Sequence, residues 1–174
     1  MTIREVLINI RERLQNAGIE DFEYESWAFL DWKLHIDRAE FYMNPHGEVK
    51  EELLAELESV LKQREQRVPL QYLMGECEFM GYDFYVDERV LIPRQDTEIL
   101  VEHALDKVED GKKVLDMCTG SGCILLSILK RYQVQGTGAD ISSEALQVAE
   151  RNRKHLALPQ VEWLQRDLFE KIEA

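Results

Sequence analysis

Long hydrophobic runs are absent from this sequence of 174 residues, and membrane proteins depend on such runs. No apolar stretch approaches the roughly 18 residues that a membrane-spanning helix needs, so we predict no membrane partner. The first residues, MTIREVLINIRERL, are amphipathic and mixed in charge, unlike a secretory signal. There is also no low-complexity tract and no fixed-period repeat. We therefore expect an ordinary globular protein of the cytoplasm.

Cysteine is scarce, which argues against a disulfide framework. The three cysteines, Cys77, Cys118 and Cys123, are odd in number, and without a secretory signal they predict reduced thiols. Cys118 and Cys123 are not spaced like the CxxC pair of a zinc site. The four histidines are scattered along the chain. The sequence therefore predicts no metal site.

Positive charge is in deficit throughout the chain. There are 21 lysines and arginines against 34 aspartates and glutamates, giving a net charge of −13. Residues 1–75 carry 9 basic and 15 acidic side chains, and residues 76–174 carry 12 and 19. A protein that binds nucleic acid normally shows a basic surface that neutralises phosphates. We predict no direct nucleic-acid partner.

Helical periodicity dominates the first 75 residues. Thr2 and Glu5 have the spacing of a capping box, and Asp21 and Asp37 are predicted to cap the next two helices. The predicted helices cover residues 2–17, 21 to about 34, 38–43 and 48–67. This part of the chain predicts a small all-helical bundle.

The pattern changes after residue 75. Aromatic and β-branched residues in CEFMGYDFYVDERVLIP (residues 77–93) alternate around Gly81, which predicts a β-hairpin between two domains. Thr97 is predicted to cap a helix that ends near Val108. The predicted strands then cover residues 113–117, 136–140 and 161–164, and the predicted helices between them cover 123–132 and 143–156. Ser142 or Ser143 is predicted to cap the second of these helices. This βαβαβ order is typical of the first half of a doubly wound sheet.

A glycine-rich loop, DMCTGSG, joins the first of these strands to its helix. Glycine lets a ligand approach the backbone, and a helix N-terminus favours an anionic group. The dinucleotide fingerprint GxGxxG does not fit, because Leu125 stands at its third glycine. A phosphate loop of the Walker type does not fit either, because Cys123 and Ile124 replace its lysine and hydroxyl residue. A small carboxylate, such as that of a methionine moiety, remains compatible.

Acidic residues end all three strands of this region. Asp116 precedes the glycine loop, Asp140 ends the second strand, and Asp167 follows the third. An acid at the end of the second strand can accept both hydroxyl protons of a ribose, and one after the third can accept from an adenine amine. Together the three acids predict a nucleoside site. Taken singly, Asp140 and Asp167 are equally compatible with loop or capping roles.

The glycine loop and its acids resemble those of class I S-adenosylmethionine-dependent methyltransferases. Three further segments resemble the PrmC/HemK family: PLQYLMG (69–75), EFMGYDFYV (78–86) and VLIPRQDTE (90–98). That family methylates the side-chain nitrogen of the Gly-Gly-Gln glutamine in peptide-chain release factors. The resemblance implies a helical substrate-recognition domain over residues 1–75, a hairpin linker over 76–95 and a Rossmann-like methyltransferase domain over 96–174. It implies an enzyme of translation termination, with release factors as partners.

The resemblance also implies which residues hold S-adenosylmethionine. The cofactor loop of the family falls on Cys118, Thr119, Gly120, Ser121 and Gly122, after Asp116. The ribose acid falls on Asp140, and the adenine position falls on Asp167 and Leu168. Cys118 departs from the family, because many members have glycine there. Arg94, Asp96 and Glu98 either border the active site or tie the hairpin to the catalytic domain.

The family's Asn-Pro-Pro-aromatic motif, which holds the target amide, has no match in residues 1–174. We therefore assign no catalytic residue, and we expect an N-terminal portion of the enzyme that is inactive by itself. The apolar strand 114–117 would then be an open sheet edge, which predicts self-association. Two alternatives remain: a non-catalytic module that binds release factors or cofactor, and a methyltransferase that acts on an adenine amine in nucleic acid.

Overall fold

The computed structural model describes residues 1–168, and the chain divides into two compact units. The first unit is Met1–Met74 and the second begins at Gly75. Within the described residues no helix is both long and apolar enough to cross a membrane. Residues 169–174 of the predicted methyltransferase domain lie outside the described part.

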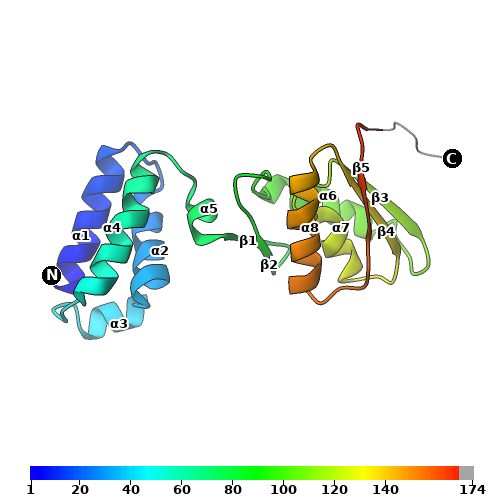
Figure 1. Cartoon of the computed structure of the whole chain (residues 1–174). Coiled ribbons are helices and arrows are strands. Elements are labelled where there is room, and N and C mark those ends of the chain that lie inside the picture. The colour runs from blue at the N-terminus through cyan, green and yellow to red at the C-terminus, as the bar shows by residue number, and fades with distance from the viewer. Residues whose placement is uncertain (169–174) are drawn as a thin grey trace. The chain divides into compact units, whose positions relative to one another are not determined.

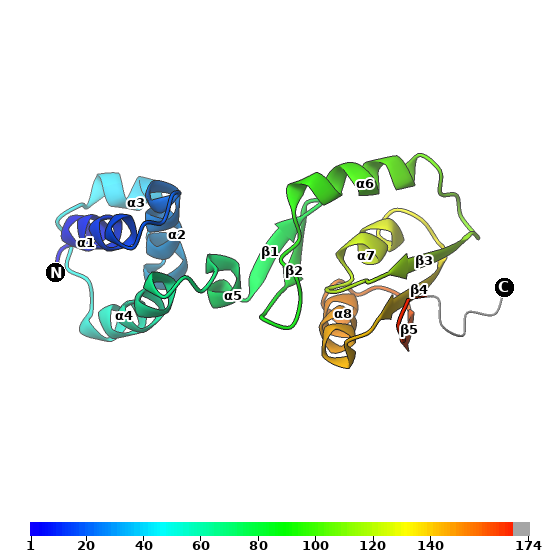
Figure 2. The same ribbon diagram turned by 90° about the horizontal axis from the view of Figure 1, so that it is seen from above.

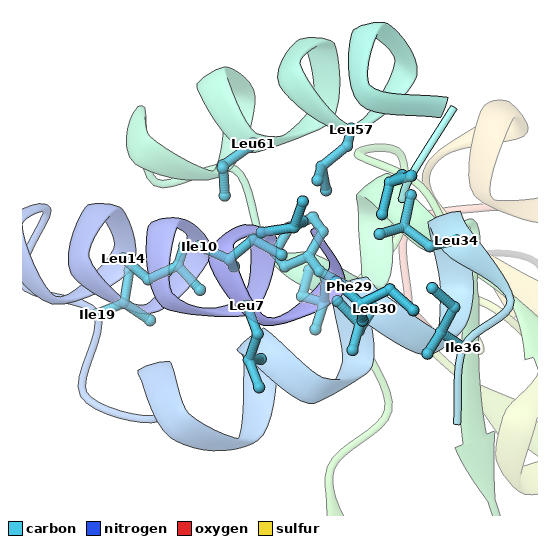
Figure 3. Close-up of a cluster of buried hydrophobic side chains, with 14 residues drawn as sticks. Leu7, Ile10, Leu14, Ile19, Phe29, Leu30, Leu34, Ile36, Leu57 and Leu61 are labelled. Carbon is cyan, nitrogen blue, oxygen red and sulfur yellow. The ribbon is translucent and has the colours of Figure 1, made fainter. Parts of the chain in front are cut away.

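The first unit, which we call the helical unit, contains helices and no sheet among its described residues (Figure 1). Its helices are α1 (Ile3–Asn16), α2 (Phe22–Leu34), α3 (Arg38–Met43), α4 (Glu51–Glu65) and α5 (Leu70–Met74). The apolar stripes of α1, α2 and α4 face one another and form one core (Figure 3). Ile10, Leu14, Phe29 and Leu30 in this core are fully buried. The predicted all-helical bundle is therefore confirmed.

Of the three helix caps predicted in the helical unit, two are confirmed and one is wrong. Thr2 N donates to Glu5 Oε2 at 2.8 Å, and Glu5 N donates to Thr2 Oγ1 at 3.3 Å, which completes the capping box. Asp37 Oδ1 accepts from Glu40 N at 2.8 Å. Asp21 precedes α2 but its side chain makes no capping bond, because its backbone (φ −89°, ψ 30°) is not extended.

Helix α4 begins later than the periodicity predicts. Glu48 pairs with Thr2 in an isolated β-bridge, and Val49 N donates to the Met1 carbonyl at 3.0 Å. The bridge holds this segment extended as far as Lys50 (φ −62°, ψ 141°), so its backbone cannot adopt helical angles before Glu51. The short helix α5 was not predicted from the sequence; it follows Pro69 directly.

The second unit contains a hairpin, a parallel sheet and three helices among its described residues (Figure 2). Its strands are β1 (Glu76–Phe79), β2 (Tyr82–Tyr85), β3 (Lys113–Met117), β4 (Gln135–Asp140) and β5 (Glu162–Gln165). Its helices are α6 (Gln95–Leu105), α7 (Cys123–Leu129) and α8 (Ser143–His155). Strands β1 and β2 pair antiparallel, and β3, β4 and β5 form a parallel sheet in that order. The mixed α/β fold with a βαβαβ unit is confirmed.

The hairpin is packed into the second unit rather than left as a free linker. Phe79 and Phe84, one from each strand, are buried with Val101 of α6 in the core of this unit. Glu98 Oε1 accepts from the Met80 backbone N–H at 2.5 Å, so α6 holds the turn of the hairpin. The sequence left open whether Glu98 borders the active site or ties the hairpin to the catalytic domain. This contact supports the second role.

The start of α6 differs from the prediction. Arg94 is the N-cap residue of α6, and Thr97 lies inside its first turn, where its N–H donates to the Arg94 carbonyl at 2.9 Å. The prediction that Thr97 caps this helix is wrong. Ser142 does cap α8, since its side chain accepts from Ala145 N at 3.2 Å.

The sheet places β4 between β3 and β5, so the carboxyl ends of all three strands lie at one edge. Leu115, in β3, is 44% exposed. Within residues 1–168, β3 pairs with β4 alone. Self-association through this strand stays a prediction.

Candidate functional site

The glycine loop, residues 118–122, connects β3 to α7 through a backbone that glycine favours. Cys118, Gly120 and Gly122 have φ values of 60°, 53° and 79°. Gly122 N donates to the Thr119 carbonyl at 2.8 Å, which closes a tight turn. Cys118 therefore adopts the left-handed conformation in which glycine is least strained, and this explains why glycine suits that position.

The two glycines of the loop face different surroundings. A Cβ atom on Gly122 would lie 3.0 Å from the Leu126 side chain and 3.2 Å from that of Ala149, so Gly122 allows α7 and α8 to pack closely. A Cβ atom on Gly120 would meet nothing within 4 Å. The backbone at Gly120 therefore borders open space that a ligand can enter.

Asp116 supports the loop from within the protein. Its side chain is buried, and its Oδ2 accepts a hydrogen bond from Thr119 Oγ1 at 2.6 Å. Burial raises the pKa of the Asp116 carboxyl, and the Thr119 hydroxyl partly opposes this. Thr119 N also donates to the Ala139 carbonyl of β4 at 2.9 Å. Asp116 and Thr119, both predicted to line the cofactor, thus hold the loop against the sheet.

Asp140 lies where the loop meets the start of α8. Its Oδ2 accepts from the Gly120 backbone N–H at 2.9 Å, and its Oδ1 accepts from the Ser142 N–H at 3.0 Å. The Asp140 side chain is half-buried, so it keeps a solvent-facing side. A carboxylate oxygen has more than one acceptor position, which leaves capacity for two ligand hydroxyls.

The end of β5 reaches the same edge of the sheet. Arg166 N donates to the Asp140 carbonyl at 3.0 Å, directly before Asp167. Asp167 and Leu168 are both exposed, and Leu168 has a positive φ of 44°. The structure thus brings the loop, Asp116 and Asp140 into direct contact. Asp167 and Leu168 follow β5 beside them.

Helix α7 contributes less to the site than the sequence suggests. It ends at Leu129, three residues before the predicted end at Tyr132, and contains 7 residues. A helix this short has a weak dipole, because few peptide units are aligned. The candidate site therefore depends on the loop backbone and on Asp140.

Sequence reasoning missed one residue beneath this site, Asn152 of α8. Its side chain is fully buried, and its Nδ2 donates to the Ser121 carbonyl at 2.9 Å. The other buried residues of α8 are apolar, and three of them lie at helical spacing from Asn152: Ala145, Val148 and Ala149. The sequence signal that could have identified Asn152 is a polar amide at a position where the helix otherwise has apolar residues.

The cysteines do not gather into a site. Burial raises the pKa of the Cys123 thiol to about 11 and also raises the pKa of Cys77. Within the part of the chain that the structure describes, no group of three or more histidine, cysteine or acidic side chains is placed to hold a metal ion. Cys118 is exposed at the glycine loop.

Two family descriptions match the chain, one in each of its two units. The PrmC N-terminal domain matches residues 5–75, and a methyltransferase domain matches residues 114–174. The first match lies almost wholly in the helical unit. The second covers β3, the glycine loop and the strands that follow.

Curated relatives match nearly the whole chain. A release factor glutamine methyltransferase of Clostridium acetobutylicum is 39% identical over 98% of this chain and 61% of its own length. The enzyme of that name from Geobacter sulfurreducens is 40% identical over 87% of this chain and 54% of its own. A third, from Koribacter versatilis, is 35% identical over 99% and 62%. The chain therefore spans slightly more than half the length of these relatives.

Proposed function

We propose that this chain belongs to the PrmC family and that the whole protein is a release factor glutamine methyltransferase. It would transfer a methyl group from S-adenosylmethionine to the side-chain nitrogen of a glutamine in a peptide-chain release factor. The observation that carries this proposal is the 39% identity to a relative of that name across 98% of the chain. That identity includes both units, so it extends beyond the general methyltransferase fold.

We assign the cofactor to the second unit. When bound, S-adenosylmethionine supplies an activated methyl group on its sulfonium. The open side of Gly120 gives its methionine part access to the loop backbone. Asp140 is placed to accept from the ribose hydroxyls while it holds Gly120 and Ser142. Asp167 and Leu168 are placed after β5 to border the adenine.

The residues that surround the loop keep it in one shape. Asp116 fixes Thr119, and Thr119 N is bonded to β4, so the loop does not need to reorganise when a ligand binds. Positioning of this kind lowers the barrier to a group transfer between two bound molecules. We assign Cys118, Ser121 and Gly122 to the same cofactor loop.

We assign substrate recognition to the helical unit, Met1–Met74. We assign no catalytic residue within residues 1–168. That this chain alone does not methylate a release factor stays a prediction. The partner protein follows from the names of the relatives. A cytoplasmic location is compatible with this role.

Calorimetric titration of the chain with S-adenosylmethionine tests the cofactor assignment. We expect binding that Asp140→Ala abolishes, because Asp140 holds both the loop and the ribose. Binding that is unchanged in Asp140→Ala would contradict the assignment.

Radiolabelled methyl transfer by the whole protein to a purified release factor tests the substrate. The matched control is a release factor whose Gly-Gly-Gln glutamine is replaced by glutamate. Label that persists on the control, or that appears only on nucleic acid, would overturn the proposal.

A further inference from the structure

Asn152 is the one fully buried amide side chain on the apolar stripe of α8 within the described residues. An asparagine costs stability at such a place unless its donors and acceptor are all bonded. Here they are. Its Nδ2 donates to the carbonyls of Tyr85 and Ser121 at 3.0 and 2.9 Å, and its Oδ1 accepts from Tyr85 N at 2.7 Å.

The two backbone segments that Asn152 joins belong to different parts of the second unit. Tyr85 ends strand β2 of the hairpin, and Asn152 bonds both its N–H and its carbonyl as a neighbouring strand would. Ser121 lies between the two glycines of the cofactor loop. One amide therefore bridges the hairpin and the loop, which are far apart in the sequence.

The bond to Ser121 controls the direction of a loop peptide. The Ser121 carbonyl and the Gly122 N–H belong to the same planar peptide unit, so fixing one fixes the other. That Gly122 N–H donates to Thr119, and the neighbouring Gly120 N–H donates to Asp140. The orientation of the loop therefore depends on Asn152 as well as on Asp116 and Asp140.

The hairpin end of the bridge is also firmly held. The Tyr85 hydroxyl donates to Asp87 Oδ2 at 2.7 Å, and the Arg151 guanidinium lies 3.2 Å from the centre of the Tyr85 ring. Asp87 is in turn paired with Arg89. A displacement of the loop that moved Asn152 would have to break this arrangement.

We propose that Asn152 is a positioning residue that couples the cofactor loop to the hairpin. Cofactor binding at the loop then tightens the hairpin at Tyr85, and correct packing of the hairpin favours cofactor binding. The identity of the ligand rests on the proposed function, whereas the coupling between loop and hairpin does not.

The affinity of Asn152→Asp for S-adenosylmethionine, measured against pH, tests this role. The aspartate keeps an acceptor for Tyr85 N but turns a second oxygen toward the carbonyls of Ser121 and Tyr85. When that carboxyl is protonated it can donate one bond again. We expect the dissociation constant to exceed that of the wild type roughly ten-fold or more at pH 8. The ratio should be smaller near pH 5.5 but stay above one, because the protonated carboxyl restores one of the two donors.

The ratio to the wild type removes other titrations from this comparison. Asp87, Arg89 and Arg151 near Tyr85, and Asp116 beneath the loop, are the same in both proteins. Gln147→Ala, an exposed position on the same helix, is the matched control and should bind like the wild type at every pH. A ratio that stays near one at pH 8, or that does not change with pH, would overturn the proposal.

Amide signals in two-dimensional NMR spectra test the coupling without any ligand. In Asn152→Ala we expect the signals of Gly120 and Gly122 to move together with that of Tyr85. Changes confined to the hairpin would overturn the coupling. If the wild type does not bind S-adenosylmethionine, the proposed function fails, and these ligand-free spectra still decide the coupling. If Asn152→Ala does not fold, Asn152→Asp at pH 5.5 and pH 8 takes its place in the same spectra.

Discussion

The two units of this chain bury polar side chains for different purposes. Among the described residues of the helical unit, the buried polar side chains are Glu25 and Ser26, which are neighbours in α2. In the second unit they are Asp116, Thr119, Ser121, Ser127 and Asn152. Except for Ser127, these lie in or contact the glycine loop or the strand that precedes it. The second unit thus concentrates its buried polar groups around one loop.

Residues with positive φ occur in both units, and the second unit also has them inside its glycine loop. In the helical unit, residues with positive φ, such as Gly18, His35 and Arg67, follow the ends of helices. In the second unit, Cys118 and Gly120 adopt positive φ inside the loop. The helices of the first unit pack on one apolar core. A loop with left-handed residues needs directional bonds to keep one shape.

Phe29→Ala should cause the largest loss of stability, and this loss should be confined to the helical unit. Phe29 is fully buried in the core shown in Figure 3, so its removal leaves a cavity. We expect the free energy of unfolding of this unit to fall by about 3–5 kcal/mol. Hydrogen exchange resolved by unit measures the loss, and the affinity for S-adenosylmethionine should stay within twofold.

Tyr24→Ala is the matched control for that substitution, because Tyr24 lies in the same helix but is 70% exposed. It should change the stability of the helical unit by less than about 0.5 kcal/mol. A large fall in cofactor affinity in Phe29→Ala would show that the two units are not independent in this respect.

Arg64→Met should have the second-largest effect on the stability of the helical unit. Arg64 Nε and Nη2 donate to the two Glu25 oxygens at 2.7 and 3.0 Å, and both side chains are nearly buried. Removing the arginine leaves an unpaired carboxylate, which should cost the helical unit about 3 kcal/mol in urea unfolding. The double variant Glu25→Leu with Arg64→Met should recover most of this loss. If the double variant stays as unstable as Arg64→Met, the ion pair stabilises the unit by more than neutralising two buried charges.

Asp140→Asn should lower cofactor affinity while leaving the helical unit unchanged. The substitution removes the charge that strengthens the hydrogen bonds to the ribose and to Gly120. A bond to a charged group contributes about 1.5–3 kcal/mol, so the dissociation constant should rise roughly 10- to 150-fold in calorimetry. Asp83→Asn, at an exposed position of β2, is the control and should bind normally.

Glu150→Gln should have the smallest effect on stability, present near neutral pH and disappearing in acid. Arg153, followed by Trp163 and Lys154, lowers the pKa of Glu150 to about 2. A lowered pKa in the folded state stabilises the protein above the unfolded pKa, and this stabilisation is lost as the pH falls from about 5 to 2.

The glutamine variant should therefore show a shallower loss of stability in the second unit over that range. The difference should be about 1 kcal/mol, because the pair is partly exposed to solvent. Hydrogen exchange of each unit, followed as the pH is lowered, measures it. An equal change in the helical unit would contradict the prediction, since Glu150 belongs to the second unit.

The elements that sequence predicted correctly are those with local causes. The capping box of Thr2 and Glu5 and the cap at Ser142 need only residues three positions apart. The glycine loop and Asp140 follow from strand–loop–helix order, which the pattern of apolar residues indicates. Parallel strands then bring the loop and Asp140 to one edge, as the structure confirms.

The elements that sequence did not predict depend on distant partners. Val49 is drawn into pairing with the N-terminus, so the start of α4 is set by a contact that periodicity does not contain. Asn152 was visible as an amide on an apolar stripe, but its partner Tyr85 is 67 residues away. A role of that kind becomes apparent only when the hairpin backbone is placed beside α8.

The most direct test of the cofactor assignment is hydrogen exchange across the whole chain with and without S-adenosylmethionine. The cofactor should slow exchange at the glycine loop, at the residues after Asp140 and at Tyr85. Exchange in Met1–Met74 should not change. Protection that appears in the helical unit, or that is absent from the glycine loop, would contradict the assignment of the cofactor to the second unit.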